Sequence, residues 1–214
     1  MTRIKFCGMT RLEDVIIACD LGAGAVGFIF WPSSPRAVTP EQARAIVRIM
    51  PPFMAMIGVF VDQPAAEVRE IAQFVGLTGV QLHGRETPEY AAEFEGHVIK
   101  AIGEPGQDLL ATAGEWPERF VLLVDGIDPR QRGGTGERAD WTAAATLART
   151  RRVILAGGLR PENVGEAVAR VRPYAVDVAS GVELRPGIKD PARMQAFADA
   201  VRAGQRVSTS QAAR

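Results

Sequence analysis

The sequence predicts a single-domain α/β protein that folds as a (β/α)8 barrel, or TIM barrel. Short apolar runs alternate with helix-like segments along almost the whole chain, at fairly even spacing. Many of these runs are rich in Val, Ile and Phe with little polar alternation, as expected for parallel strands covered on both faces. Eight such units would close on themselves, and a doubly wound open sheet is the alternative architecture.

The predicted strands are short and apolar. Their ranges are Arg3–Phe6, Ala25–Phe30, Ala55–Val61, Gly79–Leu82, His97–Ala101, Phe120–Val124, Arg152–Ala156 and Ala175–Ala179. Several segments between them begin at proline behind Thr or Asp, a combination typical of a first helical turn. The predicted helices are Leu12–Asp20, Pro40–Met50, Pro64–Val75, Pro88–Phe94, Asp108–Gly114, Asp140–Arg149, Pro161–Val171 and Pro191–Ala203. We therefore expect residues 1–203 to form one barrel domain, and residues 204–214, which are polar and rich in Ser, Gln and Ala, to form a disordered tail.

The composition is that of an ordinary soluble globular protein. Of the 214 residues, 47% are hydrophobic and 23% are charged, with 25 basic and 25 acidic side chains. No long-range basic field exists to attract nucleic acid or a membrane surface. The longest apolar runs, such as Ala55–Val61, are far shorter than the ~20 residues that cross a bilayer. We therefore expect a small-molecule partner, no nucleic acid and no membrane.

The cysteine content indicates the cellular compartment. Cys7 and Cys19 are too few for a disulfide framework and favour a reducing environment. The first residues carry Arg3 and Lys5 and lack the apolar stretch of a signal peptide. We expect a cytoplasmic protein that is a monomer or a weak homodimer.

Cys7 is the first candidate catalytic residue, because it directly follows the first predicted strand and precedes Gly8. In a barrel the catalytic groups lie just after the strands. Free cysteine is often only a small buried hydrophobe, but at a strand end its thiolate could act as a base. Lys5 lies on the same face of the strand. It could lower the pKa of the thiol, or be neutralised by Asp177 of the last strand.

Asp125 is the second candidate, because it closes the apolar run that begins at Phe120. A carboxylate in that place costs free energy unless it is solvated, paired or functional. Partial burial would raise its pKa and suit a general acid, whereas a turn aspartate before Gly126 is the structural alternative. Asp128 is close enough in sequence to compete for the acid role.

Arg36 and His83 also follow predicted strands. The planar fork of Arg36 could hold a substrate carboxylate through two hydrogen bonds, or it could be an ordinary loop residue. His83 could orient a substrate or fill the barrel mouth, with Gln81 on the same face. Two histidines and no CxxC or HxH spacing predict no metal site.

The last two strands suggest a phosphate site. Gly157 and Gly158 follow the seventh predicted strand, and Ser180 and Gly181 follow the eighth. Loops at these positions of a barrel often bind phosphate through main-chain N–H groups and a helix N-terminus. Two tight turns that merely need glycine are the alternative.

Taken together and in order, a series of motifs resembles the phosphoribosylanthranilate isomerase family over Ile4 to Asp190. The motifs are Lys5-Phe6-Cys7-Gly8-Met9-Thr10, Gly27-Phe28-Ile29-Phe30, Ser34-Pro35-Arg36, Gly58-Val59-Phe60-Val61, Val80-Gln81-Leu82-His83-Gly84, Gly133-Gly134-Thr135-Gly136, Asp140-Trp141, Leu155-Ala156-Gly157-Gly158-Leu159, Asn163-Val164, Ser180-Gly181-Val182-Glu183 and Gly187-Ile188-Lys189-Asp190. Each motif alone is weakly specific, whereas the full ordered set is highly specific.

The resemblance implies an Amadori rearrangement of N-(5-phosphoribosyl)anthranilate to its 1-deoxyribulose 5-phosphate isomer, in tryptophan biosynthesis. It implies that Asp125 is the general acid, that Cys7 is the general base and that Arg36 binds the anthranilate carboxylate. The Gly157-Gly158 and Ser180-Gly181 segments would bind the phosphate. The resemblance implies no cofactor and no metal.

Three departures from the family pattern lie outside Cys7, Asp125 and Arg36. One is the charged loop from Gly126 to Arg132, whose closure over a substrate the sequence leaves open. Ala179 stands where the family often has serine, and Ala139 replaces a common aromatic residue. Other functions remain open at this point: a barrel resembling indole-glycerol-phosphate synthase, one resembling ribulose-phosphate epimerase, or an inactive barrel that serves as a binding partner. The first would need a lysine acid at a strand end, and the second would need paired aspartates and histidines for a metal.

Overall fold

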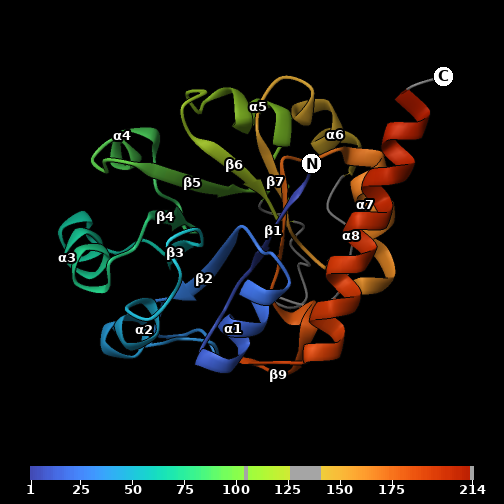
Figure 1. Cartoon of the computed structure of the whole chain (residues 1–214). Coiled ribbons are helices and arrows are strands. Elements are labelled where there is room, and N and C mark those ends of the chain that lie inside the picture. Colours follow the sequence, from blue (N-terminus) through green and yellow to red (C-terminus); the bar gives the residue numbers. More distant parts are fainter. Residues whose placement is uncertain (104–105, 126–140, 213–214) are drawn as a thin grey trace.

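The computed structural model describes residues 1–103, 106–125 and 141–212, and it contains a closed barrel of parallel strands in chain order (Figure 1). The strands are β1 (Arg3–Phe6), β2 (Ala25–Ile29), β3 (Ala55–Phe60), β4 (Gly79–Leu82), β5 (His97–Ile102), β6 (Val121–Val124), β7 (Val153–Leu155) and β8 (Ala175–Val178). Strand β1 pairs with β8 as well as with β2, with Lys5 opposite Asp177. This pairing closes the sheet, so the predicted barrel is confirmed and the open sheet is excluded.

The helices surround the barrel, one after each strand (Figure 1). They are α1 (Leu12–Asp20), α2 (Pro40–Val47), α3 (Ala65–Val75), α4 (Pro88–Ala91), α5 (Leu109–Gly114), α6 (Trp141–Ala148), α7 (Pro161–Val171) and α8 (Pro191–Ala212). The predicted capping residues accept hydrogen bonds at three of them. At α8 the side chain of Asp190 accepts from the main-chain nitrogens of Ala192 and Arg193. The side chains of Thr39 and Thr87 accept hydrogen bonds from the first turns of α2 and α4, each of which begins at proline.

Three short elements follow β8 and were not predicted. A 3-10 turn, η1 (Ser180–Val182), leads into the antiparallel strands β9 (Glu183–Arg185) and β10 (Ile188–Lys189). The hairpin turns at Pro186 and Gly187, where Gly187 has a φ angle of 80°. A Pro-Gly pair is a common turn signal, but strands this short carry too few side chains to show an alternating pattern.

Helix α8 is longer than predicted, because it continues past Ala203 to Ala212 through most of the segment expected to be disordered. Neither proline nor the β-branched runs that oppose helix formation interrupt the extension. Gln205 donates a hydrogen bond to the carbonyl of Thr2 at 2.8 Å, which ties the extension to the N-terminus. Helices α7 and α8 lie side by side (Figure 1), and a Cβ on Gly204 would collide with the main chain of Gly165.

The apolar core has two layers. Inside the barrel a small cluster includes Ile57, Ile99, Leu123 and Ile154. A larger cluster fills the space between the strands and the helices. Successive residues of a strand point to opposite faces, so each strand serves both layers, and this explains its nearly continuous apolar sequence.

None of the helices in the described part of the chain combines the length and apolar character that a bilayer crossing requires.

We predict that Phe197→Ala destabilises the fold by about 3–5 kcal/mol, because the change leaves a cavity beneath α8. Phe197 is fully buried, and its ring centre lies 6.1 Å from that of Phe6 on β1. The free energy of unfolding, measured in urea, checks this. Leu110→Ala is the control, because Leu110 is 44% exposed and its truncation should cost less than about 1 kcal/mol. Equal losses in the two variants would contradict the two-layer description of the core.

Candidate active site

The predicted site residues gather at one end of the barrel. Cys7 directly follows β1, His83 follows β4, and Asp125 follows β6. Arg36 lies in the loop after β2, and the two glycine-containing turns follow β7 and β8. Because all eight strands are parallel, these positions share the rim formed by the carboxyl ends of the strands, where barrel enzymes place their catalytic groups.

Cys7 is a buried free thiol surrounded by charged groups. Burial raises the pKa of the thiol; the Lys5 ammonium opposes this rise, whereas Asp177 adds to it. The ammonium of Lys5 lies 2.9 Å from Asp177 Oδ1, in a pair that is almost wholly buried. Both interpretations of Lys5 therefore hold, since it is neutralised by Asp177 and also faces the thiol.

Gly27 on β2 makes room for this cluster. A Cβ at Gly27 would lie 2.8 Å from Cys7 Sγ and 3.2 Å from Lys5 Nζ. Both atoms therefore project from β1 toward the same point of the neighbouring strand. Burial works against the charge of Lys5, but the negative charges of Asp177 and of the Cys7 thiolate outweigh it, so the pKa of Lys5 is raised. Lys5 is thus favoured as a cation beside the thiol.

Arg36 is held by a carboxylate of the chain itself. Its Nε and NH2 groups donate to both oxygens of Glu183, over distances of 2.7–3.1 Å. The Arg36 side chain is 18% exposed and that of Glu183 only 4%. Arg36 is therefore more than an ordinary loop residue. Its partner Glu183 had no role in the sequence analysis beyond its place in a motif.

Asp125 and His83 form a pair at the rim. His83 Nε2 lies 3.3 Å from Asp125 Oδ2, and both side chains are about one-third exposed. The other ring nitrogen, Nδ1, lies 2.8 Å from the amide nitrogen of Gln81, whose side chain points to the same face of β4. Gln81 thus fixes the orientation of the imidazole, and the imidazole meets the carboxylate that we expected to be an acid.

A buried ion pair supports the loop that carries His83. Lys100 on β5 lies 2.7 Å from Glu86, and both side chains are at most 5% exposed. The Lys100 ammonium also donates to the carbonyl of Gly84, and Glu86 accepts from the main-chain nitrogens of Gly84 and Asp62. These contacts tie together the loops that follow β3 and β4. Sequence reasoning missed this pair, although a lysine within an apolar predicted strand is a usable signal.

Two tight turns meet beside β7 and β8. Gly157 and Gly158 have φ angles of 79° and 60°, a conformation that glycine adopts without strain. Gly181, next to Ser180 in η1, lies so close to the main chain between β7 and α7 that a Cβ would overlap it. Asn163 of α7 donates to the carbonyl of Gly158 at 2.9 Å. Main-chain N–H groups at such turns and at the start of α7 suit an anion.

Several sequence expectations fall outside the described residues. They are Gly126 to Arg132 with Asp128, the Gly133-Gly134-Thr135-Gly136 motif, Ala139 and Asp140. Within the described residues, no group of three or more Cys, His, Asp and Glu side chains is arranged to hold a metal ion.

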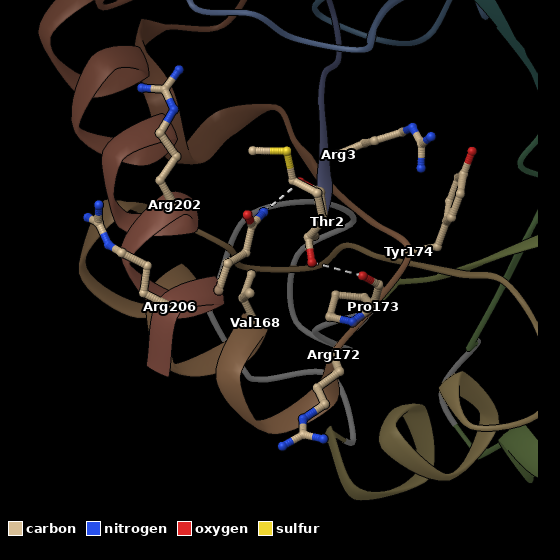
Figure 2. A pocket seen from close by; sticks show the side chains of 10 residues that line it. Thr2, Arg3, Val168, Arg172, Pro173, Tyr174, Arg202 and Arg206 are labelled. Atoms are coloured by element: carbon tan, nitrogen blue, oxygen red, sulfur yellow. Dashed lines mark hydrogen bonds between the residues drawn. The ribbon is translucent and has the colours of Figure 1, made fainter. Parts of the chain in front are cut away.

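A cavity of about 820 Å³ opens at the opposite end of the barrel, around the starts of β1 and β8. Its lining includes Arg3, Arg172, Arg202 and Arg206. Figure 2 shows that these guanidinium groups point away from one another rather than toward a common point. Arg202 is also bound to Asp199 and to the carbonyl of Leu21. The cavity is thus distinct from the candidate active site, and its arginines do not form an anion site.

Several known proteins resemble this chain in both sequence and fold. A sequence model of the family N-(5'-phosphoribosyl)anthranilate (PRA) isomerase matches residues 4–200. The N-(5'-phosphoribosyl)anthranilate isomerase of Citrifermentans bemidjiense is 46% identical over 195 residues, which are 91% of this chain and 94% of the relative. The crystal structure of phosphoribosyl anthranilate isomerase from Thermotoga maritima has a TM-score of 0.89 and 40% identity, covering 94% of this chain and 99% of that one.

A second solved structure contains a bound molecule. It is a phosphoribosyl anthranilate isomerase in complex with reduced 1-(o-carboxyphenylamino)-1-deoxyribulose 5-phosphate. It has a TM-score of 0.84 and 38% identity, and it covers 94% of this chain and 99% of that one. The family match, the curated relative and the two structures agree across nearly the whole length. The chain therefore belongs to the N-(5'-phosphoribosyl)anthranilate isomerase family.

Proposed function

We propose that this chain converts N-(5'-phosphoribosyl)anthranilate to 1-(2-carboxyphenylamino)-1-deoxyribulose 5-phosphate in tryptophan biosynthesis. The proposal assigns the general base to Cys7 and the general acid to Asp125. The observation that carries it is the placement of a thiol beside Lys5 and of a carboxyl beside an imidazole at the same barrel rim. An aldose-to-ketose rearrangement needs one proton donor and one proton acceptor.

The reaction follows from these two groups. The Asp125 carboxyl donates its proton to the furanose ring oxygen, and the ring opens to a Schiff base. The Cys7 thiolate then removes the proton from C2′, which gives an enolamine that tautomerises to the ketone. His83 faces the Asp125 carboxylate that remains after proton donation. No covalent bond to sulfur forms and no redox cofactor is required, because substrate and product are isomers and the protons move between the substrate and the side chains of Asp125 and Cys7.

The substrate has two anionic ends, and the rim offers a binding group for each. Arg36 would bind the anthranilate carboxylate, and the main-chain N–H groups around Gly157, Gly158, Ser180 and Gly181 would bind the phosphate. Ala179 supplies no hydroxyl, so the turn after β8 depends on Ser180 and the main chain. A related structure binds a reduced product analogue with both a carboxyl and a phosphate group, which supports this pairing of anion sites.

Family membership favours this function over the other barrel enzymes and over an inactive barrel. We also propose a cytoplasmic location, which the two free cysteines support. The oligomeric state, a monomer or a weak homodimer, stays a prediction that analytical ultracentrifugation can check.

Removal of either proposed catalytic group should lower kcat. We expect Cys7→Ala and Asp125→Asn each to lose a factor of about 10²–10⁴, the usual contribution of a positioned acid or base. The loss of substrate fluorescence measures the rate. Cys19→Ser is the control, because Cys19 lies on α1 and should leave kcat unchanged. Near-normal kcat in both variants would show that the assigned roles are wrong.

The charge of Lys5 should control the ionisation of Cys7. Lys5 opposes the rise in the thiol pKa, whereas Asp177 adds to it, so Lys5→Met should raise the pKa further. The alkylation of Cys7 by iodoacetamide, followed by mass spectrometry across pH, should then reach its half-maximal rate at a higher pH. Arg3→Met removes a charge from the exposed end of the same strand and should leave the profile in place. An unchanged profile in Lys5→Met would contradict the electrostatic role of Lys5.

A further inference from the structure

Lys189 is a fully buried lysine that binds three separate parts of the active-site rim. Its ammonium donates to the carbonyl of Cys7 at 2.6 Å, to the carbonyl of Ala179 at 3.0 Å and to Glu183 Oε1 at 2.9 Å. A lysine ammonium has three donors, so all of its hydrogen-bonding capacity is used. The main-chain nitrogen of Lys189 donates in turn to the buried carboxylate of Asp14 on α1. The residue after β1 and the turn after β8 are thus held by one side chain.

Glu183 joins Lys189 to Arg36. Glu183 and Lys189 stand opposite each other in the β9–β10 hairpin. Burial opposes the negative charge of Glu183, but Arg36 and Lys189 outweigh it and lower the pKa of the carboxyl. The carboxylate therefore lies between two cations, one beneath the Cys7 main chain and one in the loop after β2.

The contact with Glu183 uses only one edge of the Arg36 guanidinium. The bonds involve Nε and NH2. No hydrogen bond engages the NH1 group within the part of the chain that the structure describes. A guanidinium has five N–H donors in a planar fork, so the edge formed by NH1 and NH2 can still bind a second carboxylate through two bonds.

Gly8 brings Arg36 against the turn that holds the thiol. Gly8 follows Cys7 and has a φ angle of 70°. A Cβ at Gly8 would lie only 2.7 Å from Arg36 Cδ. The aliphatic part of the arginine therefore packs on the main chain next to Cys7, while Lys189 holds that main chain from another side.

We propose that Glu183 and Lys189 are positioning residues that hold the Arg36 guanidinium and the Cys7 main chain in one fixed arrangement. Glu183 aligns Arg36 so that its outer edge receives the carboxylate of the anthranilate ring, and Lys189 holds the main chain of the base. The inference rests on the function proposed above and deepens it, because it adds the residues that make the enzyme select a carboxylate-bearing substrate.

An opposite role for Glu183 makes a different prediction. If Glu183 occupied the place of the substrate carboxylate, its removal would strengthen substrate binding. The geometry argues against that role, because Lys189 holds Glu183 from the far side and the outer edge of Arg36 stays available. The sign of the change in KM on removal of the Glu183 carboxylate therefore separates the positioning role from the competing role.

The test compares Glu183→Gln and Lys189→Met with the wild type, on two substrates. One substrate is N-(5'-phosphoribosyl)anthranilate and the other is the matching aniline compound, which lacks the carboxylate. We expect Glu183→Gln to raise KM for the first by about tenfold or more, as for the loss of a charge-assisted hydrogen bond, and to leave KM for the second within about twofold. We expect Lys189→Met to lower kcat by about tenfold on both substrates.

Val68→Ala is the control for a general loss of stability. Val68 is fully buried on α3, away from the hairpin, so this variant should lower the melting temperature and leave both KM values unchanged. The double variant Glu183→Gln/Lys189→Met removes both charges of the buried pair together. If either single variant fails to fold, KM is measured on the double variant, which leaves no unpaired buried charge in that pair.

The outcomes distinguish the inference from the function on which it rests. A wild-type protein that does not convert N-(5'-phosphoribosyl)anthranilate would overturn the proposed function itself. With an active wild type, an unchanged or lower KM for that substrate in Glu183→Gln would overturn the role of Glu183. Equal increases of KM on the two substrates would do the same, and an unchanged kcat in Lys189→Met would overturn the role of Lys189.

Discussion

The pairing of β1 with β8 joins the first and last strands of the sheet and closes the barrel. The candidate active site depends on this closure. It places Lys5 opposite Asp177 and buries their ion pair inside the barrel. The same register brings the residue after β1, Cys7, beside the turn and hairpin that follow β8. Without closure Lys5 would lack its carboxylate partner, and Cys7 would lack the lysine that holds its main chain.

The same physical device appears on both sides of the rim. On the acid side, Lys100 binds Glu86 and the carbonyl of Gly84, next to His83. On the base side, Lys189 binds Glu183 and the carbonyl of Cys7. Each buried lysine joins a carboxylate to a main-chain carbonyl, which gives a loop one fixed position.

Such pairs are a weak source of stability, because taking two charges out of water costs nearly as much free energy as their attraction returns. Apolar side chains of similar volume could fill the same space. The value of the charged pairs therefore lies in the direction that hydrogen bonds impose, since an apolar contact would hold a loop without aligning it. An active site that depends on proton transfer needs that alignment within a fraction of an ångström.

Much of the fold and part of the site could be predicted from the sequence alone. The apolar runs, their spacing and the capping prolines are local patterns, and they determined the eight strands, most helices and the rim positions of Cys7, Asp125 and His83. The ordered motifs indicated the family, which the comparisons confirm.

Apart from the Lys5–Asp177 pair, which follows from the predicted neighbourhood of the first and last strands, only the tertiary structure decided which charges meet. Arg36 and Glu183 are 147 residues apart in the chain, and Lys189 and Cys7 are 182 apart. These contacts follow from barrel closure and from the β9–β10 hairpin, whose strands are too short to show an alternating sequence pattern. A local pattern can show that a charge is buried, but the partner of that charge is set by geometry across the whole barrel, and no local pattern contains it.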